Sequence, residues 1–366
     1  MMGGTEQAEV LELSCYVAGK EMGSELLDVH YPYTGEVIGR VRQADRSDLE
    51  NALGSTKPVE MSRWDRHEVL NKARTLLDER SEEFAQLIRS ESGLCMRETR
   101  YEVGRAQDVL QFAAMEALRD DGQIFSCDVS PQGKARKIFT VREPLNLVTA
   151  ITPFNHPLNQ VAHKLAPAIA AGAPVILKPS EKTPLTAIRF TELLYEAGLP
   201  VQMLSTIVGP VGEVITPMIE DDRVELVSFT GSVAIGKHIS RTAGYKKLCL
   251  ELGGNSPLIV LDDAGLDLAV TLAAEGCFRN SGQRCTAVKR LLIHEGVLEK
   301  FTEAFVEKIA EYPSGDPADE ATRVGTVIDE AAASLLEKRV TQAVSSGAKV
   351  LAGGQRKGAL LEPTII

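Results

Sequence analysis

The sequence predicts an α/β protein in which a parallel sheet is covered by helices. Between Arg136 and Leu261, apolar runs alternate with helical runs, and the joints between them are short and rich in glycine. The chain has 366 residues, which is enough for two domains with a large core. Its composition, 44% hydrophobic and 25% charged, is that of a globular protein.

The N-terminal part predicts a hairpin followed by helices. Two extended runs flank a turn within Tyr31–Val41. A helix with a serine N-cap is expected from Ser47 to Leu53. Apolar residues at helical spacing predict helices from Arg63 to Ile88 and from Thr99 to Leu118. Residues 1–14 are expected to form a loose tail.

The rest of the chain predicts alternating strands and helices. Strands are expected at Val175–Leu177, Leu204–Val208, Leu226–Phe229, Leu248–Leu252, Leu258–Leu261 and Arg290–Ile293, and helices at Pro184–Ala197, Val211–Ile219, Val233–Thr242, Leu268–Phe278, Leu298–Tyr312 and Asp329–Ser346. The final residues read LEPTII, which is typical of the middle of a strand. We therefore expect the chain to be truncated at its C-terminus.

Charge and motif content exclude several classes of function. A net charge of −11 argues against general binding of nucleic acid, which needs a clustered basic surface. The longest apolar run, residues 165–177, is too short to cross a bilayer. The acidic N-terminus lacks the pattern of a signal peptide, so a cytoplasmic location is expected. The sequence has no HExxH motif, and its histidines do not cluster with cysteines, so no metal site is expected.

Two of the glycine-rich joints suit a nucleotide. Ligands of such sheets bind at the carboxyl ends of the strands. In FTGSVAIG, Gly231 permits close approach of a ligand, and the helix that begins after Ser232 can receive phosphate oxygens. In ILKPSEKTPL, Lys178 and Glu181 can bond the hydroxyls of a ribose. Taken alone, each segment also fits a structural joint or a solvated loop.

Three further residues could carry carbonyl chemistry. Glu251, beside a Gly-Gly turn, is a candidate general base, since partial burial raises the pKa of a carboxyl group. Asn155 can donate to a developing oxyanion. Cys285 follows Arg284, and a neighbouring cation favours the nucleophilic thiolate. The structural alternatives are a surface glutamate, a helix cap or Asx turn, and a small buried cysteine.

The order of these motifs carries a resemblance. Along the chain follow PFN, KPSEKTP, FTGS, LELGG and GQRC. In this order and spacing, the chain resembles the aldehyde dehydrogenase superfamily over residues 15–366. The resemblance implies a Rossmann-type NAD-binding domain over residues 15–252, with an oligomerisation excursion near 122–142. It also implies an α/β catalytic domain over 253–366 that is incomplete at its C-terminus.

The resemblance also implies roles for the residues. Cys285 is expected to form a thiohemiacetal, Asn155 and the Cys285 backbone N–H to form the oxyanion hole, and Glu251 to activate water. The expected cofactor is NAD, with NADP disfavoured because the Glu181 carboxylate repels a 2′-phosphate. The positions that match cofactor contacts are Ile151, Thr152, Pro153, Lys178, Ser180, Glu181, Gly212, Gly231, Ser232, Gly236 and Leu252.

The same resemblance suggests an anionic aldehyde as substrate. Arg105, His156 and Arg284 are expected to clamp its charged end, and Thr286 lies beside the nucleophile. The local text is most similar to family members that oxidise phosphonoacetaldehyde. The alternatives are glyceraldehyde 3-phosphate without phosphorylation, lactaldehyde, and succinic semialdehyde. Three other classes of function stay open: an inactive truncated binding protein, a cysteine hydrolase and a CoA-acylating enzyme. A homodimer or homotetramer is expected for the full-length form.

Overall fold

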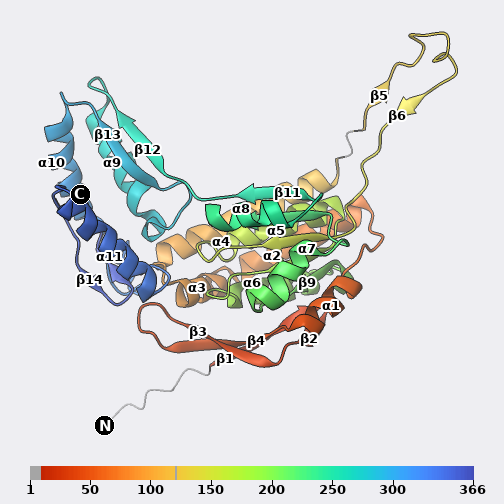
Figure 1. Cartoon of the computed structure of the whole chain (residues 1–366), viewed down its shortest axis with the longest axis horizontal. Helices are drawn as coiled ribbons and strands as arrows, with labels where there is room; N and C mark the ends of the chain where they lie inside the picture. Colours follow the sequence, from red (N-terminus) through yellow and green to blue (C-terminus); the bar gives the residue numbers. More distant parts are fainter. Residues whose placement is uncertain (1–9, 120–121) are drawn as a thin grey trace.

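The computed structural model describes residues 10–119 and 122–366, and it confirms the α/β class. A nine-stranded sheet forms the centre, with the order β11-β10-β7-β8-β9-β1-β4-β3 and with β2 paired to β1 (Figure 1). The strands are β1 (Leu11–Val17), β2 (Lys20–Met22), β3 (Glu25–His30), β4 (Val37–Gln43), β7 (Val148–Ile151), β8 (Val175–Lys178), β9 (Leu204–Thr206), β10 (Leu226–Thr230) and β11 (Lys247–Glu251).

The five strands from β11 to β9 are parallel to one another, as the sequence predicts. The three inner strands β7, β8 and β9 are buried on both faces: in β8, Val175 and Leu177 belong to one apolar cluster and Ile176 to the other. Buried β-branched and aliphatic residues of this kind are typical of parallel strands. The remaining strands make the sheet mixed, because β1 runs antiparallel to β9 and β3 antiparallel to β4.

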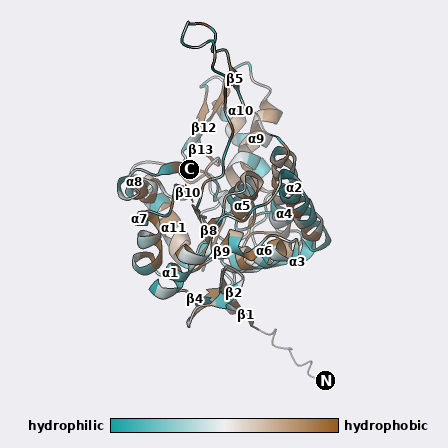
Figure 2. Ribbon diagram, turned by 90° about the vertical axis from the view of Figure 1, so that its right-hand side faces the viewer, coloured by the Kyte–Doolittle hydropathy of each residue, from teal (hydrophilic) through white to brown (hydrophobic). Residues whose placement is uncertain are grey.

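Helices cover both faces of this sheet (Figure 2). The apolar cluster on one face contains residues of α2, α4 and α5, and the cluster on the other contains residues of α1, α7 and α8. The helices are α1 (Arg46–Ser55), α2 (Arg63–Glu79), α3 (Ser81–Ser92), α4 (Met96–Ala117), α5 (Asn159–Ala171), α6 (Leu185–Glu196), α7 (Thr216–Glu220) and α8 (Val233–Thr242), with short turns η1 (Val201–Met203) and η2 (Val211–Ile215).

A second, smaller unit follows β11. It has its own apolar cluster, which includes Val260, Phe301 and Phe305. Its elements are β12 (Ser256–Val260), α9 (Leu266–Phe278), η3 (Arg279–Gly282), β13 (Val288–Ile293), α10 (Leu298–Ile309), α11 (Glu330–Ser345), β14 (Arg356–Lys357) and β15 (Leu360–Leu361). The division into domains at residue 252 stays a prediction.

A two-stranded arm projects from the body of the molecule (Figure 1). It consists of β5 (Ile124–Phe125) and β6 (Ile138–Phe139), which pair antiparallel. Ile124 and Phe139 are 90% and 70% exposed, so the arm presents apolar side chains to solvent. The arm coincides with the excursion expected near residues 122–142.

Three details of the sequence-based expectation are wrong. The tail does not reach residue 14, because Leu11–Ser14 pair with Gly39–Arg42 in the sheet; residues 1–9 lie outside the described part. Helix α1 is capped by Asp45, whose side chain accepts from the Asp48 N–H, and not by a serine. The LEPTII segment is no continuous strand: after β15 it contributes one isolated bridge, from Ile365 to Ala352.

No helix among the described residues is long and apolar enough to span a membrane.

Candidate active site

The loop that carries Cys285 begins with an unusual backbone. After α9 ends at Phe278, Asn280 and Ser281 adopt φ angles of 57° and 51°, and Gly282 follows at 69°. Left-handed backbone is rare for residues other than glycine, although asparagine tolerates it best. This reversal carries the chain from α9 to Cys285, which is exposed together with Thr286.

Asn155 is joined directly to this loop. Its Nδ2 donates to the backbone carbonyl of Gln283 over 2.7 Å. The amide nitrogen carries two hydrogens, so one fixes the side chain to the loop and the other remains for an oxyanion. Gln283 is held in turn, since its Oε1 accepts from the Ile328 N–H at 3.0 Å. The structure therefore brings the predicted oxyanion donor and the predicted nucleophile into one hydrogen-bonded unit.

The loop after Glu251 packs against the same unit. A Cβ at Gly254 would come closer to the Cys285 carbonyl oxygen than the 3.0 Å that real Cβ contacts keep. Glycine at this position therefore permits two backbones to meet. Glu251 itself ends β11, and its carbonyl accepts from the Gly231 N–H at 3.0 Å. Its side chain is exposed, which corrects the expectation of partial burial.

The carboxyl ends of β7, β8 and β10 form the edge at which a nucleotide is expected. Ser232 caps α8, and its Oγ accepts from the Ile235 N–H. The buried hydroxyls of Thr152 and Thr230 find no hydrogen-bond partner among the described residues. Unpaired buried hydroxyls, together with the N-terminus of a ten-residue helix, fit a polar anionic ligand such as the pyrophosphate and ribose of NAD.

Lys178 and Glu181 pair with each other at the end of β8. The distance from Nζ to Oε1 is 2.5 Å, and the lysine side chain is 5% exposed against 38% for the glutamate. Burial lowers the pKa of Lys178, while the Glu181 charge opposes this shift. Because Glu181 remains accessible, it is free to accept hydrogen bonds from ribose hydroxyls.

The other predicted cofactor positions divide into three groups. Ile151, Thr152 and Ser180 are buried at strand ends, and Pro153 is half-buried there. Gly212 lies exposed in η2. Gly236 and Leu252 contact each other, and a Cβ at Gly236 would overlap the Leu252 side chain. Gly236 therefore serves the close packing of α8, whatever else it contacts.

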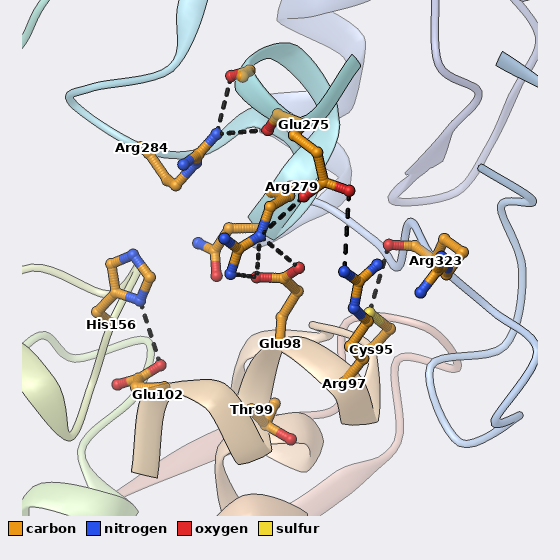
Figure 3. A network of polar contacts seen from close by, with 12 residues as sticks. Cys95, Arg97, Glu98, Thr99, Glu102, His156, Glu275, Arg279, Arg284 and Arg323 are labelled. Atoms are coloured by element: carbon orange, nitrogen blue, oxygen red, sulfur yellow. Dashed lines mark hydrogen bonds and ion pairs between the residues drawn. The ribbon is translucent and has the colours of Figure 1, made fainter. Parts of the chain in front are cut away.

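In the structure, each of the three residues predicted to bind the substrate's charged end contacts a different part of the protein. Nη2 of Arg284 donates to the carbonyls of Glu275 and Gly276 at 2.9 and 2.8 Å, at the C-terminal end of α9. Figure 3 shows the guanidinium directed toward this helix end. Basic side chains are stabilised there by unpaired carbonyls and the helix dipole. Adjacency to Cys285 in sequence therefore does not put the Arg284 charge at the thiol, and its substrate role stays a prediction.

Arg105 and His156 occupy other surroundings. Arg105 is exposed on α4, pairs with Asp108 at 3.1 Å, and lines a cavity of about 940 Å³ that does not include Cys285. His156 Nδ1 lies 3.3 Å from Glu102 Oε2. Figure 3 marks this contact with a dashed line. His156 is nevertheless next to Asn155, so it remains near the reacting centre.

Sequence reasoning missed Glu102, which organises this turn. Its side chain is fully buried, and Oε1 accepts from the N–H groups of Leu158 and Asn159 at 2.8 and 3.0 Å. These two donors belong to the start of α5. A carboxylate at a helix N-terminus satisfies free N–H groups and suits the dipole. The only signal in the sequence was an acidic residue on the apolar face of a predicted helix.

A partly buried ion pair, with its carboxylate buried, joins the start of the cysteine loop to α4. Arg279 donates from Nε and Nη2 to Glu98 at 2.9–3.2 Å, a contact drawn with dashed lines in Figure 3. Its guanidinium lies 4.4 Å from the centre of the Tyr101 ring. The side chains of Arg279 and Glu98 are 23% and 5% exposed. This pair, 181 residues apart in sequence, was not predicted either.

Lys164 is a further buried charge near the site. Its Nζ donates to Ser228 Oγ at 2.9 Å. Burial lowers its pKa to about 8, and the charges of Cys249 and Glu251 oppose this shift. No helix was predicted here, but the position of Lys164 directly before the longest apolar run, residues 165–177, could have drawn attention to it.

Comparison with known proteins agrees with this geometry. Residues 16–366 match the model of the aldehyde dehydrogenase family. The chain is 40% identical to a 3-sulfolactaldehyde dehydrogenase of Priestia aryabhattai, over 99% of this chain and 77% of that protein. It superposes with a TM-score of 0.93 and 36% identity on aldehyde dehydrogenase 21 from Physcomitrella patens in complex with the reaction product succinate, covering 98% of this chain and 76% of that one.

A betaine aldehyde dehydrogenase from Staphylococcus aureus, solved in complex with NAD+, superposes with a TM-score of 0.91 at 32% identity, over 96% of this chain and 74% of that one. The chain belongs to the aldehyde dehydrogenase family. It is an enzyme that oxidises an aldehyde, and NAD as its cofactor is consistent with the family.

Proposed function

We propose that this enzyme oxidises a short aldehyde with an anionic far end, most specifically phosphonoacetaldehyde to phosphonoacetate, with Cys285 as nucleophile. The observation that carries the chemistry is the hydrogen bond from Asn155 Nδ2 to the carbonyl of Gln283, two residues before the cysteine. It fixes an amide donor at the nucleophile's own loop, where the charge of an adduct develops.

The residues divide the reaction between them. The Cys285 thiolate adds to the aldehyde carbon, and the resulting oxyanion accepts from the second N–H of Asn155 Nδ2 and from the Cys285 backbone N–H. NAD, which Lys178, Glu181 and the N-terminus of α8 would hold, would supply the hydride acceptor, so that the carbon on Cys285 would reach the oxidation level of a thioester. Glu251 then takes a proton from the water that attacks this thioester. The acid is released, and the cysteine is regenerated.

Two observations support an anionic substrate. His156 follows the oxyanion donor directly, and Arg105 lies on α4, the helix whose Glu102 contacts His156. One similar protein is named a 3-sulfolactaldehyde dehydrogenase. Another was solved in complex with the reaction product succinate. Sulfonate, carboxylate and phosphonate share negatively charged oxygens, which arginine and histidine side chains recognise. The phosphonate preference itself rests on the sequence resemblance.

A substrate panel tests this proposal. NADH formation is measured with phosphonoacetaldehyde, 3-sulfolactaldehyde, succinic semialdehyde, glyceraldehyde 3-phosphate and the neutral control butyraldehyde. We expect kcat/KM at least about 10-fold higher for the anionic aldehydes than for butyraldehyde, and highest for phosphonoacetaldehyde. Cys285→Ser should abolish turnover while NAD binding, measured by calorimetry, is kept. Equal kcat/KM for charged and neutral aldehydes would contradict the anionic class, and full activity of Cys285→Ala would contradict the mechanism.

Arg284 needs a separate test, because its guanidinium is bound to α9. If it turns to the substrate, Arg284→Ala raises KM for phosphonoacetaldehyde by about 10-fold and leaves KM for butyraldehyde unchanged. If it only stabilises the helix end, both KM values move together and the melting temperature falls. Arg105→Ala is the comparison for the melting temperature, which it should leave nearly unchanged, because Arg105 is exposed and contributes little to stability.

The arm of β5 and β6 supports a homo-oligomer. Its exposed apolar side chains, among them Ile124 and Phe139, suit burial against a second copy. Sedimentation of the chain and of the Ile124→Asp variant tests this, with a smaller species expected for the variant.

A further inference from the structure

Asn280 is the residue of the cysteine loop whose chemistry the proposed reaction leaves unused. It is 1% exposed, lies five residues before Cys285, and adopts φ 57° and ψ 34°. Its Nδ2 donates to the backbone carbonyl of Asn155 at 3.0 Å. The contact joins two segments that are 125 residues apart in sequence.

This hydrogen bond forms half of a reciprocal contact. Asn280 Nδ2 donates to the main chain of Asn155, and Asn155 Nδ2 donates to the main chain of Gln283. The first bond fixes the backbone of Asn155, and the second fixes its amide plane relative to the cysteine loop. With both ends held, the remaining N–H of Asn155 has a set direction.

The amide of Asn280 makes no other hydrogen bond among the described residues, since its buried Oδ1 is without a partner. Burial of an unsatisfied oxygen is costly, and so is the left-handed backbone at this residue. Two unfavourable features at one position, beside the reacting residues, indicate a requirement that packing alone does not explain.

We propose that Asn280 is a positioning residue, which holds Asn155 so that its free N–H meets the oxyanion formed at Cys285. This inference rests on the proposed function. Asparagine fits because it tolerates left-handed backbone and supplies a short N–H donor; aspartate has the first property only, and glycine has the backbone freedom without the donor.

The test compares two reactions of the same sulfur. With p-nitrophenyl acetate, the thiolate adds to the ester carbonyl, an oxyanion forms, and p-nitrophenolate leaves to give an acetyl thioester. With iodoacetamide, the thiolate displaces iodide from a saturated carbon, and no oxyanion forms. Acylation is followed by release of p-nitrophenolate, after subtraction of the rate of Cys285→Ser. Alkylation of Cys285 is followed by peptide mass spectrometry, because Cys249 is also exposed.

Asn280→Asp and Asn280→Gly should lower the acylation rate by about 10- to 100-fold. This loss is no larger than the one expected for removing an oxyanion donor itself. Their alkylation rate should stay within about 2-fold of the parent chain. Ser281→Gly is the matched control: Ser281 is also left-handed, and its Oγ bonds the Gly325 carbonyl, but it takes no part in the contact with Asn155. It should change neither rate by more than about 3-fold.

A double substitution distinguishes positioning from a general structural role. In the Asn155→Ala background the donor is already absent, so Asn280→Gly should lower acylation by less than about 2-fold further. Equal losses of acylation and alkylation in the Asn280 variants would overturn the inference, and so would additive losses in the double variant. An Asn280 variant that does not fold would overturn it as well, since a positioning role requires a folded chain. If the parent chain itself shows no acylation of Cys285, the proposed function fails instead.

Discussion

Gly254 and Cys285 meet backbone to backbone, although they belong to different elements of the chain. The main chain after β11 passes so close to the cysteine loop that a Cβ on Gly254 would overlap the Cys285 carbonyl oxygen. Lys289 Nζ donates to the Gly254 carbonyl at 2.9 Å, and this hydrogen bond helps to hold the Gly254 main chain in place. The second glycine of LELGG thus sets the distance between the Glu251 segment and the nucleophile.

We predict that Gly254→Ala lowers kcat by about 10-fold or more, because the two loops must move apart and a displacement of about 1 Å at a reacting centre costs this much or more. Gly253→Ala is the matched control, since the nearest atom to its added Cβ is Val233 Cγ2 at 3.8 Å, an ordinary contact. Steady-state kinetics with the preferred aldehyde compares the two. Equal activity of both variants would mean that the loops separate without consequence.

Glu102→Gln should destabilise the protein. The substitution removes the charge of a buried carboxylate that accepts from two N–H groups at the start of α5. Hydrogen bonds to charged groups contribute about 1.5–3 kcal/mol each, so we expect the free energy of unfolding to fall by about 2 kcal/mol. Denaturation by urea measures this change.

Glu116→Gln is the control for Glu102, because Glu116 lies on the same helix and its side chain is 61% exposed. Its substitution should change stability by less than about 0.5 kcal/mol. A loss for Glu102→Gln no larger than this would show that the amide replaces the carboxylate fully.

The alternation of apolar and helical runs predicted the class of fold and several strand ends, because these depend on local patterns: period and turn residues. The nucleophile came from the resemblance that the order of motifs carries, and it stays a prediction. Neither kind of reasoning predicts contacts across the fold or where long side chains turn. Arg284 was expected to face the substrate because it precedes Cys285, yet its guanidinium bonds the end of α9. Contacts across the fold, such as Arg279 with Glu98, are equally hidden, since no local pattern reports a partner far along the chain.

Glu91 should make stability depend on pH. Its buried carboxyl accepts from the N–H groups of Leu185 and Thr186, and burial raises its pKa from 4.5 to about 8. The folded state therefore binds more protons than the unfolded state between these values. Its contribution to stability is complete below pH 4.5 and is lost as the pH rises toward 8.

The measurement is urea unfolding of the parent chain and of Glu91→Gln from pH 5 to pH 8. Because glutamine stays neutral, the variant should gain stability relative to the parent as the pH rises. Glu82→Gln, on the same helix, should show no such gain, since hydrogen bonding to Arg100 lowers the pKa of Glu82. Parallel curves for the parent and Glu91→Gln would contradict the prediction.

The partly buried pair of Arg279 and Glu98 should depend on the guanidinium fork. Lysine keeps the charge but offers a single nitrogen, so Arg279→Lys loses the two-nitrogen contact with Glu98 and the stacking on Tyr101. Leaving a buried carboxylate poorly paired is expected to cost about 2–3 kcal/mol of unfolding free energy.

Arg100→Lys is the matched control for Arg279. Arg279 pairs with Glu98 and, over 3.6 Å, with Glu275, and Arg100 likewise pairs with two carboxylates, those of Glu82 and Glu320, but at the surface. Exposed pairs contribute at most about 1 kcal/mol, so its substitution should cost less than that. Urea unfolding of both variants measures the two losses of unfolding free energy. Equal losses would mean that burial adds nothing to the contact of Arg279 with Glu98. Since Arg279 directly precedes Asn280, we also expect Arg279→Lys, and not Arg100→Lys, to slow acylation of Cys285.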